Sequence, residues 1–210
     1  SPFLNDKKQC VVMNGLDTSV FYPRLVETLR QQHDSSKKTI LYVTTTLTEK
    51  ENDLKGGHYV LKLAEQLKKE NVCILVAGYY DKTIHIPSNM VMLGRLDNQD
   101  TLAQYYSMAN LTILTSKRET FSMVVAESLC CGTPVVGFQA GGPESIALPV
   151  YSEFVEQGDI VALKKAVLHM LSQKIERKEV AKSAENAYSG ERMVREYVRI
   201  YEELVEEKNG

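Results

Sequence analysis

Two glutamates eight positions apart, Glu119 and Glu127, have the residue types and spacing that most suggest chemistry in this chain. Glu119 lies just before a helix that Ser122 can cap, where the backbone N–H groups of Ser122, Met123 and Val124 could hold an anion. Glu127 lies inside that helix among apolar neighbours, so burying it without a partner would cost several kcal/mol. We therefore expect Glu127 to have a hydrogen-bond or ion-pair partner. We expect Glu119 to bind a chemical group that is attached to the anion.

A sugar nucleotide would satisfy these three features together. Its pyrophosphate would accept hydrogen bonds from the helix N–H groups, and its hydroxyl groups would donate to the two carboxylates. The alternative is that Glu119 is an ordinary surface residue and that Glu127 pairs with an arginine or lysine of the core. The residues of this helix alone leave both interpretations open.

The segments before and after this helix predict a strand on either side of it. The run Leu111–Thr115 is short, apolar and rich in β-branched residues, which is typical of a buried strand. The helix is expected to end at Cys131, because Gly132 can adopt the left-handed conformation and Pro134 cannot continue a helix. A second apolar strand, Pro134–Phe138, follows. This order predicts a βαβ unit with its functional loop at the carboxyl edge of the sheet.

The order of these motifs resembles one known family. Glu119, seven residues, Glu127, a helix ending in Cys-Gly-Thr-Pro-Val-Val and a loop beginning Gly141-Gly142 are similar to the donor-binding half of a family 4 retaining glycosyltransferase of the GT-B fold. The resemblance extends from about Val11 to about Leu204. It implies an α/β fold with a Rossmann-like parallel sheet flanked by helices, which is one half of a GT-B fold.

The resemblance also implies roles for single residues. Glu127 would bind the ribose hydroxyls of the donor, and Glu119 the hydroxyls of its sugar. Neither is expected to act as a general base, and a role for Glu119 as nucleophile stays open. Arg95 and Leu96 would flank the base. The expected catalytic residue is Glu119, and the expected donor-binding set is Lys55, Arg95, Leu96, Glu119, Phe121, Ser122, Met123, Val124, Glu127, Gly141 and Gly142.

Two of these positions have ordinary alternatives. Lys55 is followed by two glycines at a strand-to-helix turn, where a lysine can reach a phosphate, yet a lysine beside a glycine turn is usually just solvated. Arg95 could instead form a surface ion pair with Asp97 or Asp100. The sequence also departs from the family pattern, because many members have Gly-Arg where this chain has Thr44-Thr45. One of the two usual phosphate cations is therefore missing.

Composition excludes several other classes of function. The 210-residue chain carries 25 basic and 27 acidic residues, so its net charge of −2 gives no general attraction to nucleic acid. The four histidines are scattered without metal-ligand spacing, so we expect no metal and no cofactor. The four cysteines have no disulfide-framework spacing, and no leader or long apolar run is present. These features predict a cytoplasmic protein.

We expect three regions in the chain: a tail or linker over residues 1–9, a nucleotide-sugar-binding domain over 10–187, and a C-terminal helix over 188–210. Cys10–Met13 is expected to be a short strand that the Asn14-Gly15 turn ends. In the resembled family a segment like Asn14–Pro23 opens the donor domain after the acceptor domain, which is therefore expected to be missing here. The C-terminal helix is expected to pack back toward that domain.

The remaining elements follow from apolar periodicity and from capping residues. Strands are expected at 39–44, 72–77 and 90–93, and helices at 59–69, about 98–109, 160–171, 175–187 and 191–207. Asn98 or Asp97 is expected to cap the second of these helices, and Asp159 the third.

The expected function is sugar transfer with retention from a UDP- or GDP-sugar to a glycan or lipid-linked acceptor, as in polysaccharide biosynthesis. The acceptor would bind in the missing N-terminal domain, which could also contact a membrane peripherally, so the chain by itself is expected to be inactive. Two alternatives stay open. One is a nucleotide-sugar epimerase, because the same architecture hosts that chemistry. The other is a non-catalytic α/β interaction module in which the two glutamates merely pair with core cations.

Overall fold

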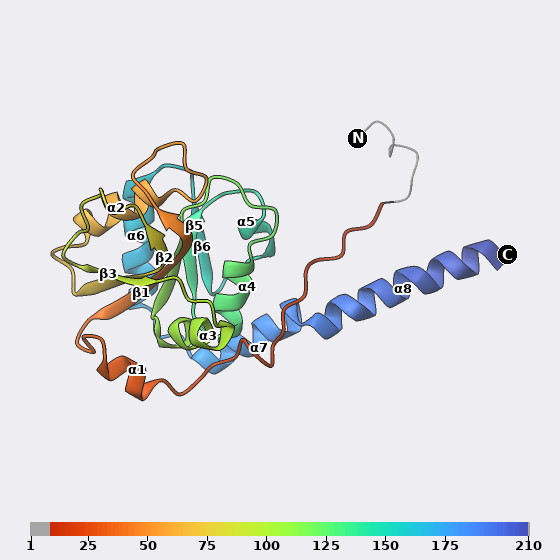
Figure 1. Ribbon diagram of the computed structural model, residues 1–210. Helices are drawn as coiled ribbons and strands as arrows, with labels where there is room; N and C mark the ends of the chain where they lie inside the picture. The colour runs from red at the N-terminus through yellow and green to blue at the C-terminus, as the bar shows by residue number, and fades with distance from the viewer. Residues whose placement is uncertain (1–8, 210) are drawn as a thin grey trace.

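The computed structural model describes residues 9–209, and these residues form a parallel β-sheet covered by helices on both faces (Figure 1). The expected α/β class with a Rossmann-like sheet is confirmed. The strands lie in the order β3-β2-β1-β4-β5-β6. Their bounds are β1 Lys38–Leu47, β2 Val72–Tyr80, β3 Met90–Gly94, β4 Leu111–Leu114, β5 Val135–Phe138 and β6 Ser152–Val155.

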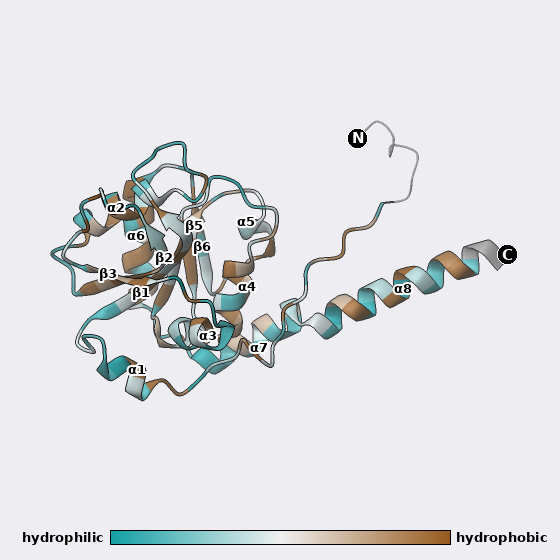
Figure 2. Ribbon diagram, viewed as in Figure 1, coloured by the Kyte–Doolittle hydropathy of each residue, from teal (hydrophilic) through white to brown (hydrophobic). Residues whose placement is uncertain are grey.

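The sheet separates two hydrophobic cores. In Figure 2 the strands between the helices are largely coloured as hydrophobic. All four residues of β4 and all four of β5 are buried, as expected of central strands with both faces covered. One core lies under α2 (Gly57–Gln66) and α6 (Ile160–Ser172). The other lies under α3, α4 and α7, and α1 packs beside α3. The bounds of these helices are α1 Glu27–Gln31, α3 Gln99–Met108, α4 Met123–Cys130 and α7 Arg177–Tyr188.

The strand order reverses between β1 and β4. The chain builds outward from β1 through β2 to β3, returns to place β4 beside β1, and then builds outward the other way through β5 and β6. β1 and β4 pair in parallel, with Ile40 opposite Leu111 and Tyr42 opposite Ile113. Open α/β sheets bind ligands outside the carboxyl ends of the strands at such a reversal. A ligand is therefore expected beside the loops that follow β1 and β4.

Several expected helix ends are confirmed. The Asn98 side chain accepts hydrogen bonds from the first turn of α3, and Asp159 does the same for α6. Gly132 ends α4 with φ +78°, and a Cβ there would lie 2.7 Å from the carbonyl oxygen of Arg177. A side chain at position 132 would therefore be strained by its backbone and blocked by α7. The turn after β5 leads into a short helix, α5 (Pro143–Ile146).

The start of the domain differs from expectation. Cys10–Met13 is not a strand, because no described strand lies beside it, and Val11 is 89% exposed. Asn14-Gly15 forms no hairpin turn either. Gly15 instead lies against the start of α8 (Gly190–Asn209), where an added Cβ would be 2.7 Å from the Cα of Gly190. Two further elements, α1 and β6, were not expected, and β1 and β2 both run three residues beyond their expected ends.

Helix α8 projects away from the body, and the segment preceding Leu16 leaves the body beside its base (Figure 1). The Arg192 guanidinium donates to the carbonyl oxygens of Met13 and Asn14. Much of the apolar stripe of the helix is exposed, including Val194, Tyr197, Val198, Tyr201, Leu204 and Val205. Its packing against another domain stays a prediction, as does the division at residue 187. Within residues 9–209, no helix is long and apolar enough to cross a membrane.

Candidate functional site

The loops after β1 and β4 are joined by an ion pair between Lys55 and Glu119. The Lys55 Nζ lies 2.7 Å from the Glu119 Oε1, and their side chains are 36% and 18% exposed. The hydroxyl groups of Tyr42 and Thr115 both donate to the Lys55 carbonyl at 2.9 Å, which fixes the backbone of the lysine. Gly56 has φ +69°, and a Cβ there would lie 2.1 Å from the Thr115 carbonyl oxygen. A glycine is therefore required for the first loop to approach β4 so closely.

The amino terminus of α4 begins at Ser122, the one non-glycine residue in the described chain with a positive φ, at +77°. Its expected side-chain cap is absent, because this left-handed backbone differs from the extended conformation in which a capping hydroxyl reaches the helix N–H groups. The Ser122 Oγ is instead buried without a hydrogen-bond partner. Within residues 9–209, no acceptor is recorded for the N–H groups of Met123 and Val124. This helix start is free to receive an anion.

Glu127 finds its partner in α3 rather than in a core cation. The Tyr106 hydroxyl donates to the Glu127 Oε2 at 2.9 Å, and Tyr106 is completely buried. No lysine or arginine of the described residues lies within ion-pair distance of Glu127. Burial raises the pKa of Glu127, and the hydrogen bond from Tyr106 opposes that rise. Tyr106 was not among the site residues expected from the sequence. The only signal for this contact is the hydroxyl group that Tyr106 carries at helical spacing among apolar residues.

The glycine-rich turn after β5 pairs with the Glu119 loop. Glu119 donates its N–H to the Ala140 carbonyl, and Gly142 donates to the Glu119 carbonyl at 2.9 Å. A Cβ at Gly142 would lie 2.4 Å from the Thr120 carbonyl carbon, so the two backbones can meet only at a glycine. The N–H of Gly141 donates to Glu144 at 2.7 Å. Gly142 thus positions Glu119, and in this state the Gly141 N–H group is already engaged.

Glu144 holds this turn with both of its oxygens, since it also accepts from the Ala140 N–H at 2.9 Å. Burial by itself would raise the pKa of Glu144, but the backbone hydrogen bonds outweigh it and lower the pKa. The carboxylate is therefore a fixed structural part of the loop.

The expected base contacts lie at a distance from this centre. Arg95 and Leu96 follow β3, which β2 separates from β1. Arg95 forms an exposed ion pair with Asp97, with Nε and Oδ1 2.5 Å apart, so the ordinary alternative for this residue is realised. Leu96 packs in part against the core under α3 and α4. The structure therefore does not bring these two residues to the Lys55–Glu119 pair, and a ligand touching both places would have to be elongated.

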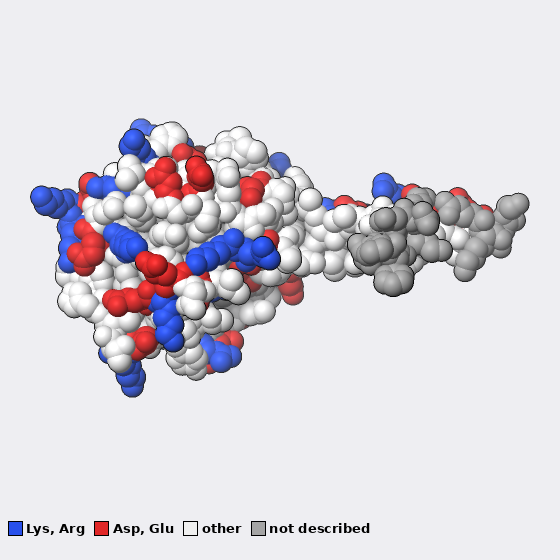
Figure 3. All heavy atoms as spheres, turned by 90° about the horizontal axis from the view of Figure 1, so that it is seen from above, with Lys and Arg blue, Asp and Glu red and all other residues white. Residues whose placement is uncertain are grey.

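The remaining candidates divide between core and surface. The Phe121 ring is nearly buried and packs edge-on against Tyr188, with ring centroids 6.4 Å apart, while Met123 is 39% exposed. At the end of β1, Thr44 is buried and Thr45 is exposed, so the strand simply continues through them to Leu47. On the face of the molecule that Figure 3 shows, which is the view of Figure 1 seen from above, acidic and basic side chains lie next to one another.

Metal-ligating side chains do not cluster in the described part of the chain, where no group of three or more His, Cys, Asp or Glu could hold an ion. All four cysteines are free thiols.

Comparison with known proteins decides the family. The family model described as "Glycosyl transferases group 1" matches residues 26–187. The chain belongs to the group 1 glycosyltransferase family. The matched range covers all six strands, the helices α1 to α6 and nearly all of α7, so the Lys55–Glu119 pair and the Tyr106–Glu127 pair both lie inside this glycosyltransferase domain.

Individual relatives agree with this assignment. N-acetyl-alpha-D-glucosaminyl L-malate synthase of Bacillus anthracis is 24% identical over an alignment of 216 positions, which covers 95% of this glycosyltransferase chain and 55% of the relative. Sucrose-phosphate synthase from Thermosynechococcus elongatus shares the fold with a TM-score of 0.78 and 20% identity over 93% of this chain and 52% of its own. Anabaena HepE, solved with UDP and glucose, has a TM-score of 0.74 and 19% identity, over 93% and 56%. This chain therefore spans about half the length of these relatives.

Proposed function

We propose that this chain is the donor-binding half of a retaining glycosyltransferase that uses a UDP- or GDP-sugar. The observation that carries the proposal is that Lys55 and Glu119, from the loops after β1 and β4, meet at the point where the strand order reverses. A cation, a free helix start and a carboxylate side by side match the diphosphate and the sugar of such a donor.

Each group has a task in the proposed reaction. As the bond between the sugar and the diphosphate breaks, negative charge grows on the leaving group, and Lys55 with the N–H groups at the start of α4 stabilises it. Glu119 binds hydroxyls of the donor sugar, and Glu127 binds the ribose hydroxyls. Donor binding then requires Lys55 to exchange Glu119 for the diphosphate, since the two are paired in this structure. No metal ion is part of this proposal.

The relatives support the donor class. HepE was solved with UDP and glucose and also with UDP-glucose. The acceptor, proposed to be a glycan or a lipid-linked sugar, would bind in a second domain, because this chain spans about half the length of its relatives. A cytoplasmic location, and peripheral membrane contact through that domain, belong to the same proposal.

One observation favours a second candidate, a non-catalytic module in which the glutamates serve only as structural partners. Glu119 does pair with a cation, as that alternative expects. Glu127 does not fit it, because its partner is a phenol and its carboxylate keeps a raised pKa. A structural carboxylate is usually held by a cation or by several N–H groups, which lower its pKa. The donor-binding function therefore remains the better account.

Nucleotide-dependent stabilisation tests the proposal. The melting temperature of the 210-residue chain is measured with UDP, GDP, dTDP and ADP, alongside Glu127→Gln and the control Glu65→Gln, an exposed glutamate on α2. A ligand at one hundred times its dissociation constant adds roughly 2.7 kcal/mol to the free energy of unfolding. We expect one nucleotide to stabilise the wild type and Glu65→Gln but not Glu127→Gln. Equal stabilisation of all three proteins, or of none, would contradict the proposal.

A further inference from the structure

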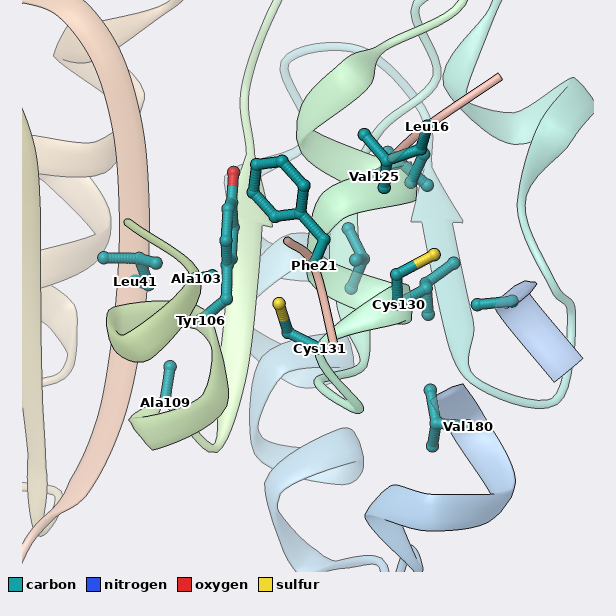
Figure 4. Packing of buried hydrophobic residues seen from close by; sticks show 14 of the residues in the cluster. Leu16, Phe21, Leu41, Ala103, Tyr106, Ala109, Val125, Cys130, Cys131 and Val180 are labelled. Atoms are coloured by element: carbon teal, nitrogen blue, oxygen red, sulfur yellow. The ribbon is translucent and has the colours of Figure 1, made fainter. Parts of the chain in front are cut away.

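Tyr106 occupies a rigid place between the sheet and α4. It extends from α3 and is completely buried, with its ring 6.4 Å from that of Phe21 at an interplanar angle of 63°. Figure 4 shows this ring between Leu41 and Phe21, with the hydroxyl oxygen at the end remote from α3. Packing on both faces leaves the ring no other orientation without opening the core. The hydroxyl is therefore delivered to one fixed point.

That point is one oxygen of the Glu127 carboxylate. The Tyr106 hydroxyl donates to Oε2, while Oε1 accepts no hydrogen bond from the described residues and is not among the side-chain oxygens sealed from solvent without a partner. A carboxylate held by one oxygen keeps the other oxygen, and the remaining lone pair of the first, for new donors. Oε2 of Glu127 is therefore held by Tyr106, and Oε1 is available to a ligand.

The choice of acceptor sets Tyr106 apart from the other large buried tyrosines. The Tyr42 hydroxyl donates to the backbone carbonyl of Lys55, and that of Tyr188 to the carbonyl of Ile146. A backbone carbonyl satisfies a buried phenol without burying a charge, so these two contacts hold the backbone in place and involve no ionised group. Tyr106 instead supports a partly buried carboxylate without a cation. Such a carboxylate costs stability, so its presence indicates that it is kept for a ligand.

We propose that Tyr106 is a positioning residue for nucleoside recognition, holding Glu127 so that its open oxygen receives the 2′- and 3′-hydroxyls of the donor ribose. This inference rests on the proposed function and adds a residue of α3 to it. Tyr106 does not touch the ligand. It fixes the rotamer of the side chain that does, and it keeps that side chain charged by donating to its ionised form.

The first test compares Tyr106→Phe with the wild-type chain by calorimetric titration with UDP and 2′,3′-dideoxy-UDP, or with the GDP pair if GDP is the nucleotide that binds. Phenylalanine preserves the ring and its packing and removes only the hydroxyl. We expect about tenfold weaker binding of the ribonucleotide, because a hydrogen bond to a charged group is lost. Binding of the dideoxy nucleotide, which has no hydroxyls for Glu127, should change less than twofold.

Tyr188→Phe is the matched control. It also removes one buried phenolic hydroxyl from the same core, and it should lower the melting temperature while leaving the ratio of ribonucleotide to dideoxynucleotide affinity unchanged. Equal weakening of both nucleotides by Tyr106→Phe would reduce Tyr106 to a packing residue and overturn the inference.

The second test is the pH dependence of ribonucleotide affinity. Protonation of Glu127 removes an acceptor, so affinity should fall on the acid side, and the midpoint should move to higher pH in Tyr106→Phe because the loss of the hydroxyl raises the Glu127 pKa further. Around this contact, burial raises the pKa values of the Cys130 and Cys131 thiols to about 12, so both stay neutral. Besides Glu127 itself, the charged groups that act on these thiols are Glu185 and Arg24, and both are present in the wild type and in Tyr106→Phe.

The outcomes separate the two claims. If the wild-type chain binds a nucleotide and Tyr106→Phe binds it equally well with the same midpoint, the positioning role is overturned and the proposed function stands. If the wild-type chain binds no nucleotide at all, the proposed function falls and the positioning role falls with it.

Discussion

The Lys55 ammonium group lies 2.7 Å from the Glu119 carboxylate, so the cation proposed to hold the donor diphosphate and the carboxylate proposed to hold the donor sugar neutralise each other in this structure. Each must leave the other before it can bind its own part of the donor. The pair is partly exposed, and such pairs contribute only about 0.2–1 kcal/mol. The exchange is therefore inexpensive.

Glu119→Gln should separate the two roles. Without the competing carboxylate, Lys55 is free for the diphosphate, so we expect the affinity for UDP to rise about two- to fivefold. The affinity for a UDP-sugar should rise less or fall, because the contact to the sugar is weakened. Titrations with UDP and UDP-glucose measure both effects. Weaker UDP binding in the variant would show that the ion pair supports the site rather than closing it.

Glu127→Gln should change the pH dependence of stability. A folded-state pKa raised above the usual value of 4.5 means that the folded protein binds a proton that the unfolded chain has released. This group therefore stabilises the fold below its unfolded pKa and loses that contribution as the pH rises through its folded pKa. Relative to the wild type, the melting temperature of Glu127→Gln should increase from acid to neutral pH. The control Glu65→Gln should give a flat difference, and a flat difference for Glu127→Gln would refute the prediction.

Exchanging serine and glycine at the two ends of α4 should change the free energy of unfolding in opposite directions at Ser122 and at Gly132. Ser122→Gly relieves a left-handed serine with a buried unpaired hydroxyl, and it is expected to raise the free energy of unfolding by roughly 1 kcal/mol. Gly132→Ser creates the same strain and also forces its Cβ against the Arg177 backbone, so a loss of about 2 kcal/mol or more is expected. Urea denaturation measures both. A loss of stability in Ser122→Gly would mean that the serine hydroxyl has a stabilising partner.

Thr45→Arg should supply the second phosphate cation that the Gly-Arg pattern of the resembled family would place here. Thr45 is exposed near the end of β1, so the longer side chain can be accommodated without disturbing the core. We expect several-fold tighter binding of UDP at low ionic strength and a smaller gain at high salt. Gln104→Arg adds the same charge to an exposed position of α3 and is the control. If UDP affinity rose equally in both variants, the gain would come from the added net charge and not from the position of the arginine.

Sequence reasoning succeeded where local chemistry decides structure. The Asn98 and Asp159 caps, the Gly132 helix end and the buried strand at Leu111 all follow from short segments whose preferences agree with the fold. It failed where distant segments decide. Cys10–Met13 has the composition of a strand but no neighbouring strand to pair with, and propensity alone does not supply one.

The candidate site shows the same division. The helix start at Ser122 could be predicted, whereas its left-handed backbone could not, because serine rarely adopts it. The pairing of Lys55 with Glu119 joins residues 64 positions apart and depends on the reversal of strand order between β1 and β4. Tyr106 could be placed on an apolar helix face, but its acceptor on α4 required the packing of two helices.

The junction of Leu16 with the start of α8 has a mechanical consequence. Leu16 donates its N–H to the Tyr188 carbonyl at 2.7 Å and accepts from the Gly190 N–H at 2.9 Å. The entering chain and the start of α8 are therefore hydrogen-bonded to each other at one corner of the body. Glycine at both Gly15 and Gly190 lets the two backbones cross almost in contact. A force applied to the entering chain or to α8 is therefore passed to the same corner of the domain, because each segment is hydrogen-bonded to the other there.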